Sequence, residues 1–459
     1  MKHTLVANIE TYIERFFGKG HERTIKAKKN IVALFILRGV IAGTNFLIVP
    51  LTLHYLNPTR YGIWLTLTSL IGLAGLLDLG LGHGLRNKLA EAIARSNEAL
   101  AHSYVSTAYA VIAGFVIVIS VLFLSINPFL HWSSILNTGP EMSAELSLLA
   151  AIVFLFFLLR LVFGLIGTVL LAMQRPAMST LLEAIINMLT LILVYILTKV
   201  SFGSLLFLGF AVSATGALVP LGANFWFFKN TYPQLAPSFH SIDLVYSRDL
   251  LGLGVQFFIL QITGLIVFST ANIIIAQLFG PLEVTTYNIA FKYYGIALTG
   301  FMILLTPFWT AFTDAFVRTD YAWIRRAIRS LVKYWLLLCV GVVVMTIVAD
   351  RFYLLWVGTS VHVPFELSLL MGIYVIIFTW SYIFAVFVNG TGKIRLMIWS
   401  SVIVALINIP LSIFLAKNLG LKNAGVVLGS CISLLPGCVM WPVQMMKLLR
   451  GRAKGIWAR

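Results

Sequence analysis

The chain has 459 residues, of which 60% are hydrophobic and only 11% are charged. Because soluble domains carry about 25% charged residues, this composition excludes a water-soluble globule and indicates an integral membrane protein. The 33 Lys and Arg outnumber the 16 Asp and Glu. In a membrane protein such an excess is typical of cytoplasmic loops and of contacts with anionic lipid heads rather than of nucleic-acid binding.

The first thirty residues are basic and amphipathic, and no small-residue cleavage site follows the first apolar run. We therefore expect that run to remain as a membrane anchor. Crossing about 30 Å of hydrocarbon takes about 20 apolar residues, so the sequence predicts twelve membrane-spanning helices. Strands are excluded because their unpaired backbone groups cannot face lipid. The predicted spans are 31–55, 61–81, 102–126, 147–172, 178–198, 204–228, 250–279, 284–309, 334–349, 365–389, 396–416 and 423–446.

Lys and Arg are distributed unevenly between the two sides of these spans. The amino end, the loops after even-numbered spans and the carboxyl end hold about five times as many as the other loops. The positive-inside rule then predicts that both basic termini, 1–30 and 449–459, lie in the cytoplasm.

The two halves of the chain resemble each other. Asn57-Pro58 joins the first two predicted spans, and Gly280-Pro281 joins the seventh and eighth. A basic amphipathic stretch follows in each half, at Leu85–Ser96 and at Tyr321–Arg329. The simplest account is two six-helix bundles related as parallel repeats, which enclose a central cavity of the kind where transporters place their substrate; chance similarity is the alternative. The first bundle, the linker and the second bundle are predicted at 31–230, 231–248 and 249–448.

A glycine-rich stretch follows the second span. Gly80, Gly82 and Gly84 allow the backbone to bend at the cytoplasmic face, so we expect the next helix to lie along the lipid headgroups. A nucleotide-binding glycine loop would need a preceding strand, which the sequence does not predict. The basic residues expected at the membrane surface in the two halves are Arg86, Lys88, Arg95, Arg325, Arg326 and Arg329.

Polar residues recur at helical spacing inside the apolar spans. Arg38 and Asn45 share a face of the first span, Arg160 shares one with Gly164 and Thr168 in the fourth, and Lys292 lies in the eighth. Charges within spans usually face a bundle interior or a wet cavity, so the three cations predict a ladder for an anionic head group. Interhelical hydrogen bonding is the alternative, which we favour for the hydroxyl residues. The candidate substrate-binding residues are Arg38, Asn45, Arg160, Lys292, Gln261 and Asn272.

Three acids, Asp78, Glu183 and Asp314, are expected near the cytoplasmic ends of their helices. Asp78 and Arg38 lie at similar depth, so they could form an ion pair that closes an inner gate. A protonation site that couples transport to the proton gradient is the alternative, because burial raises the pKa of a carboxyl and a nearby Arg lowers it.

Three cysteines, Cys339, Cys431 and Cys438, fall in apolar segments. Without a CxxC pair or clustered histidines they predict packing roles rather than metal or redox chemistry. We therefore expect no metal site and no cofactor.

Two stretches carry a family resemblance. DLGLGHGLRNKLAEA begins at Asp78, and YNIAFKYYGIALTGF begins at Tyr287. With twelve spans in two halves, they resemble bacterial oligosaccharide flippases of the Wzx type, in the multidrug/oligosaccharidyl-lipid/polysaccharide exporter superfamily. The resemblance covers nearly the whole chain and implies a V-shaped pair of bundles that alternates between inward-open and outward-open states. It also implies that cavity cations hold the pyrophosphate and acidic sugars, a role that matches Arg38, Arg160 and Lys292.

From this resemblance we expect a flippase, not an enzyme, in the bacterial inner membrane. It would move undecaprenyl-pyrophosphate-linked glycan units from the cytoplasmic to the periplasmic leaflet by ion-coupled alternating access. Its partners would be that lipid-linked oligosaccharide, the bilayer, and a polysaccharide polymerase with a chain-length regulator. A drug/cation antiporter of the same superfamily is the nearest alternative, although it would favour cavity acids. A membrane-embedded polymerase or ligase usually has a large basic periplasmic loop, and the loop 127–146 contains no Lys or Arg.

Overall fold

The computed structural model describes residues 22–75, 81–247 and 270–458, and the regular elements in these ranges are all helices. Ten of them are long and apolar enough to cross a membrane. This confirms an all-α polytopic membrane protein.

The helices of the first half are α2 (Glu22–Leu56), α3 (Pro58–Leu73), α4 (Leu81–Ala94), α5 (Glu98–Ile126), α6 (Trp132–Ile135), α7 (Ser143–Phe163), α8 (Leu165–Ala172), α9 (Pro176–Val200) and α10 (Leu205–Trp226). Those of the second half are α12 (Pro281–Val317), α13 (Tyr321–Val357), α14 (Phe365–Thr391), α15 (Arg395–Asn418) and α16 (Lys422–Leu449).

Two of the twelve predicted spans extend beyond the described residues. The predicted span 61–81 corresponds to α3, of which 16 residues are described, and the predicted span 250–279 corresponds to an apolar helix described over Thr270–Phe279. The total of twelve therefore stays a prediction.

Several helices begin with a polar N-cap residue. The side chain of Asn57 accepts a hydrogen bond from the backbone N–H of Arg60, and Pro58 occupies the first turn of α3. Asn97 caps α5 in the same way, by accepting from the N–H of Leu100. Such caps satisfy backbone donors that the first helical turn leaves unpaired.

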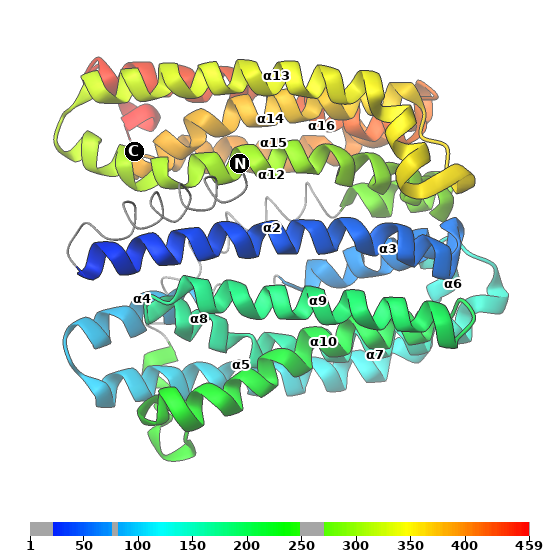
Figure 1. The fold of residues 1–459 in the computed structure, drawn as a ribbon, viewed down its shortest axis with the longest axis horizontal. Coiled ribbons are helices and arrows are strands. Elements are labelled where there is room, and N and C mark those ends of the chain that lie inside the picture. The colour runs from blue at the N-terminus through cyan, green and yellow to red at the C-terminus, as the bar shows by residue number, and fades with distance from the viewer. Residues whose placement is uncertain (1–21, 76–80, 248–269, 459) are drawn as a thin grey trace, which may run out of the picture.

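The helices pack into two groups that follow the order of the chain. In the first half α2 packs on α9 and α7 packs on α10, whereas in the second half α14 packs on both α12 and α16. Figure 1 shows the blue-to-green helices of the first half beside the yellow-to-red helices of the second. The main contact between the groups is made by α3 and α12.

The linker between the halves is attached to the first half. His102 on α5 forms a hydrogen bond through Nε2 with the carbonyl oxygen of Ala236, at 2.8 Å. The hydroxyl of Thr107 donates to the carbonyl of Asp243 and accepts from its N–H, at 3.2 and 3.1 Å. These contacts fix the described part of the linker along the first turns of α5.

One predicted surface helix is not separate from its span. Residues 321–329 form the first turns of the 37-residue helix α13, which continues through the predicted span 334–349. The basic stretch is continuous with this span, because neither Gly nor Pro interrupts the chain between Arg329 and Tyr334. By contrast, α4 is a separate helix, since Ser96 adopts a positive φ of 56° and Asn97 caps the helix that follows.

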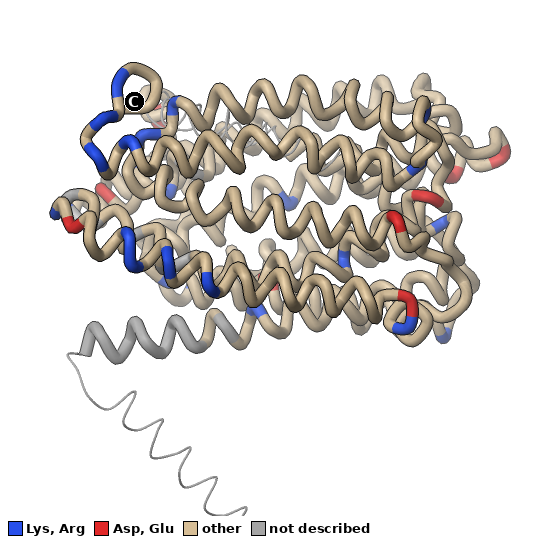
Figure 2. Tube along the Cα trace, turned by 90° about the horizontal axis from the view of Figure 1, so that it is seen from above, with Lys and Arg blue, Asp and Glu red and all other residues tan. Residues whose placement is uncertain are grey.

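The surface of the bundle combines an apolar belt with one basic end. Along α13, Ile347 and Leu355 are 75% and 87% exposed, as expected for side chains that face lipid. Figure 2 shows Lys and Arg gathered mainly at the end of the bundle where the C-terminus lies. Under the positive-inside rule this end would face the cytoplasm.

Candidate functional site

Two neighbouring cavities in the first half are both lined by Arg160, and the larger of these has a volume of about 550 Å³. It contains the predicted polar face of the fourth span, made by Arg160, Gly164 and Thr168, together with Glu183 from the next span. Its full lining is Gly75, Gly82, Phe157, Arg160, Leu161, Gly164, Leu165, Ile166, Gly167, Thr168, Leu171, Ser179, Leu182, Glu183, Ile186 and Pro220. It therefore lies between α3, α4, α7, α8, α9 and α10.

A smaller cavity of about 270 Å³ lies on the other side of Arg160. It shares Arg160 and Phe157 with the larger one, so these two residues border both cavities. Its lining is Trp64, Thr68, Ile71, Gly72, Val153, Phe156, Phe157, Arg160, Val212, Ser213 and Gly216. Aromatic rings and hydroxyl groups from α3, α7 and α10 therefore surround the arginine.

A break in the predicted span 147–172 lies directly after Arg160. Gly164 separates α7 from α8, and the N–H of Gly167 donates to the carbonyl of Gly164, three residues back, at 3.0 Å. The carbonyl of Phe163, four residues before Gly167, instead accepts from the side-chain amide of Asn224 on α10, at 2.8 Å. Interrupted helices of this kind recur at transporter binding sites, where the irregular backbone lines a cavity.

Asn224 is a buried polar residue beside the helix break, and the sequence analysis did not single it out. Its side-chain oxygen accepts a hydrogen bond from the hydroxyl of Tyr109 on α5, so three helices meet at one buried amide. The available signal was an Asn in an apolar span, four residues after Pro220. Polar residues at such positions often satisfy backbone groups that a helix break sets free.

Gly216 on α10 lies within van der Waals range of the Arg160 side chain. A Cβ at Gly216 would lie 3.5 Å from both Cδ and Nη1 of Arg160. Pro220 has no N–H to donate to the carbonyl of Gly216, so this turn of α10 also carries a carbonyl without its usual helical partner. Among the described residues, Arg160 forms no ion pair.

Arg38 and Glu183 form an ion pair beside the larger cavity. Nη1 of Arg38 lies 3.5 Å from Oε2 of Glu183, and the two side chains are 51% and 48% exposed. The sequence suggested Asp78 as the partner of Arg38, but Asp78 lies outside the described residues. The contact found here places Arg38, on α2, next to an acid that lines the cavity of Arg160.

Lys292 lies at the contact between the two halves. Its Nζ donates to the hydroxyl of Tyr61 on α3 at 3.2 Å, and it lies 6.0 Å from the centre of the same ring. Lys292 lines neither of the two cavities. The structure therefore brings Arg38 and Arg160 to one region and holds Lys292 at another.

The remaining substrate-binding candidates are dispersed. The amide of Asn272 donates to Ser69 on α3 at 2.8 Å and accepts from Asn288 at 2.7 Å, so this buried group joins the halves by interhelical hydrogen bonds. Asn45 is exposed on α2 and lines neither cavity. Gln261 lies outside the described residues, and so does the side chain of Asp314, whose backbone belongs to α12.

The predicted membrane-surface cations lie on two helices. Lys88 on α4 and Arg95, directly after the end of α4, both pair with Glu91, at 3.7 and 2.6 Å. Arg86 is exposed, and so are three cations in the first turns of α13. These three are Arg325, Arg326 and Arg329. Contact with lipid headgroups stays a prediction for all six.

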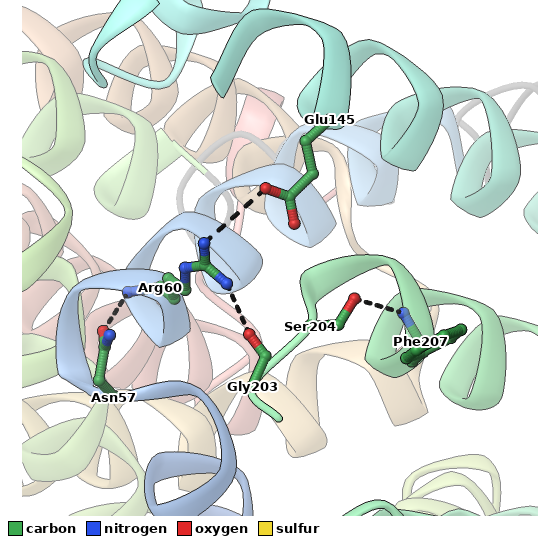
Figure 3. Close-up of polar contacts among 6 residues, drawn as sticks. All are labelled: Asn57, Arg60, Glu145, Gly203, Ser204 and Phe207. Atoms are coloured by element: carbon green, nitrogen blue, oxygen red, sulfur yellow. Dashed lines mark hydrogen bonds and ion pairs between the residues drawn. The ribbon is translucent and has the colours of Figure 1, made fainter. Parts of the chain in front are cut away.

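The opposite ends of the helices are joined by a polar cluster around Arg60 (Figure 3). Nη1 of Arg60 donates to the carbonyl of Gly203 at 2.6 Å, and Nη2 lies 3.9 Å from Oε2 of Glu145. The same first turn of α3 is capped by Asn57. This cluster ties α3 to α7 and to the turn before α10. The helices α3, α7 and α10 also line the smaller cavity.

A family model described as polysaccharide biosynthesis protein matches residues 27–310, more than half of the chain. The chain belongs to the polysaccharide biosynthesis protein family. Family relatives include a Salmonella typhi protein named as an O-antigen transporter, 21% identical over 78% of this chain and 82% of its own length. A Yersinia pseudotuberculosis protein named as an O-antigen export protein is 22% identical over the same shares.

Solved structures of MOP-superfamily transporters share the fold of this family member. An inward-facing multidrug resistance transporter of the MATE family matches with a TM-score of 0.75 and 15% identity, over 92% of this chain and 99% of that chain. An outward-facing structure of such a transporter matches with a TM-score of 0.65 and 15% identity, over 93% and 97%. At this identity the likeness describes the fold alone.

Proposed function

We propose that the chain is a flippase for lipid-linked oligosaccharides that works by alternating access in the bacterial inner membrane. The family match, the relatives and the fold describe a polysaccharide exporter rather than an enzyme. The finer assignment depends on one observation. Arg160 is an exposed cation that lines both of these cavities, with no acid paired to it among the described residues.

The chemistry of this site favours an anionic substrate. An unpaired cation in an apolar bundle is costly unless it faces water or an anion, and a guanidinium binds phosphate through several donors in a fixed plane. Glu183 is engaged by Arg38, which leaves Arg160 as the free charge of the larger cavity. A diphosphate joined to a sugar and a polyprenyl chain fits such a site, because its lipid tail can remain in the bilayer.

The contacts between the halves support an inward-open state. The hydroxyl of Thr285 donates to the carbonyl of Pro58 at 2.6 Å, and Gly62 packs directly against the backbone of Pro281. Asn137 and Gln277 exchange further hydrogen bonds with the facing half. These residues lie at the end predicted to be periplasmic. In the proposed cycle the head group enters from the cytoplasmic leaflet, binds at Arg160 and leaves when this end opens.

Replacement of Arg160 tests this function. In the native bacterium deleted for this gene, we expect Arg160→Ala to abolish surface polysaccharide at normal protein levels, because the diphosphate loses its cation. Arg160→Lys should restore part of the signal. Lys199→Ala, which removes an exposed cation outside both cavities, is the matched control and should complement fully.

Two results would contradict the proposal. Full complementation by Arg160→Ala would exclude an essential role for this cation. Normal surface polysaccharide in the deletion strain, together with a new sensitivity to cationic drugs, would instead identify a drug antiporter. Ion coupling and contacts with a polymerase or a chain-length regulator stay predictions.

A further inference from the structure

The smaller cavity has a composition that phosphate binding alone does not require. Three aromatic side chains line it, Trp64, Phe156 and Phe157, together with the hydroxyl residues Thr68 and Ser213. A site for phosphate alone would gather cations and backbone N–H groups. A site for a polyprenyl chain would gather apolar side chains without hydroxyl groups. This cavity combines rings, hydroxyls and the Arg160 guanidinium in about 270 Å³.

The two hydroxyl groups are available to a ligand. Thr68 donates to the helical carbonyls of Trp64 and Leu65, at 2.9 and 3.0 Å, and its oxygen can still accept. The Ser213 hydroxyl forms no hydrogen bond among the described residues, although it lies on α10, where it could donate to a helical carbonyl. A ligand in the cavity would supply its missing partner.

We propose that the smaller cavity binds a sugar ring directly beside the phosphate held by Arg160. A pyranose has C–H groups on its faces and hydroxyls around its edge. The negative faces of aromatic rings attract polarised C–H groups. For the sugar hydroxyls, Thr68 supplies an acceptor, Ser213 supplies both a donor and an acceptor, and Arg160 supplies several donors. The inference rests on the proposed function and extends it, because it assigns the neighbouring sugar to a defined subsite.

Glycine 72 offers a way to fill this subsite without disturbing the fold. A Cβ at Gly72 meets nothing within 4 Å, and Gly72 lines the smaller cavity but not the larger one. Gly72→Leu should therefore occupy the cavity and leave Arg160 in place. Gly114 on α5 also has open space around its Cβ and lines neither cavity, so Gly114→Leu is the matched control.

The test measures ligand binding to the purified full-length protein in lipid nanodiscs by calorimetry. The probes are inorganic phosphate, farnesyl phosphate and three sugar phosphates, namely the 1-phosphates of glucose, galactose and N-acetylglucosamine. We expect at least one sugar phosphate to bind more tightly than phosphate does. Gly72→Leu should remove this advantage and leave phosphate binding unchanged. Ser213→Ala should weaken the binding of the same sugar phosphate by about threefold to tenfold, which corresponds to the loss of one hydrogen bond. Gly114→Leu should change neither phosphate binding nor sugar-phosphate binding.

The outcomes separate the subsite from the anion site. Equal affinity of the wild type for phosphate and all three sugar phosphates would overturn the subsite. So would a Gly72→Leu effect on farnesyl phosphate in place of the sugar phosphates, which would identify a lipid-chain site. If Gly72→Leu fails to fold, the effect of Ser213→Ala on sugar-phosphate affinity decides whether the subsite exists, because this substitution removes only one hydroxyl. Unchanged phosphate binding in Arg160→Ala would instead overturn the anion site and the function proposed from it.

Discussion

At the scale of single residues, the cavity depends on polar groups that stand in for lost backbone partners. Gly164 interrupts the fourth predicted span, and the amide of Asn224 satisfies the carbonyl of Phe163 that the break sets free. Without that donor, a buried carbonyl would remain unpaired in an apolar bundle, which is costly. Asn224 therefore positions the break that presents Arg160, although it touches neither cavity itself.

We expect Asn224→Leu to lower the free energy of unfolding by about 1–3 kcal/mol, because it leaves the Phe163 carbonyl and the Tyr109 hydroxyl without partners. Thermal unfolding in detergent measures this loss. Asn230→Ala is the control, since Asn230 is exposed and bonds only within its own helical turn. Equal stability of the two variants would show that the break does not depend on Asn224.

At the scale of helices, prolines leave carbonyl oxygens without a helical donor, and tryptophans on neighbouring helices donate to these carbonyls. Pro50 cannot donate to the carbonyl of Phe46, which accepts instead from the indole Nε1 of Trp356 on α13, at 3.2 Å. The two rings stack with their centroids 4.0 Å apart. Trp380 likewise donates to the carbonyl of Cys438, at 3.1 Å and four residues before a proline of α16. The first contact joins the two halves, and the second joins helices within one half.

Because only the Trp356 contact joins the two halves, replacing Trp356 or Trp380 with Phe should have different effects. Trp356→Phe keeps a ring against Phe46 but removes the donor, so we expect about 1 kcal/mol less stabilisation of the state described here. The distance between nitroxide labels at Phe202 and Thr359, two exposed positions at the end predicted to be periplasmic, should shift towards longer values. Trp380→Phe should lower thermal stability and leave that distance unchanged. The same distance distribution in both variants would contradict the assignment.

At the scale of the whole molecule, the halves meet most closely where α3 and α12 begin. A Cβ at Gly62 would overlap the carbonyl oxygen of Pro281, so the two backbones are in direct contact there. Lys292 with Tyr61 and the buried amide of Asn272 extend this contact inwards along the same helices. The contact between the halves at the end predicted to be periplasmic is thus built from small residues and interhelical hydrogen bonds, as is common between membrane helices.

We expect Gly62→Val to prevent the outer ends from closing as they do here, because neither backbone can yield locally. Surface polysaccharide should be lost at normal protein levels, and the label distance across the outer end should lengthen. Gly43→Val on α2 is the control, since a Cβ at Gly43 meets nothing within 4 Å. Normal transport by Gly62→Val would show that the contact can open by another route.

The sequence by itself was sufficient for the fold class and for the polar face that lines the larger cavity. Long apolar runs predict helices, because only a helix satisfies its backbone hydrogen bonds within one segment in lipid. An arginine spaced with Gly164 and Thr168 predicts a polar face, and this face does line the larger cavity. The family resemblance followed from two short stretches and agrees with the family match.

Only the tertiary structure decided which polar residues meet. Arg38 pairs with Glu183, which is far away in sequence, and Lys292 lies against Tyr61 at the interface between the halves. Helical spacing predicts which residues share a face of one helix, but it contains no information on which neighbouring helix that face meets. The break at Gly164 was hidden for a similar reason. Whether a glycine interrupts a helix depends on its surroundings, and here the amide of Asn224 on another helix satisfies the carbonyl that the break frees.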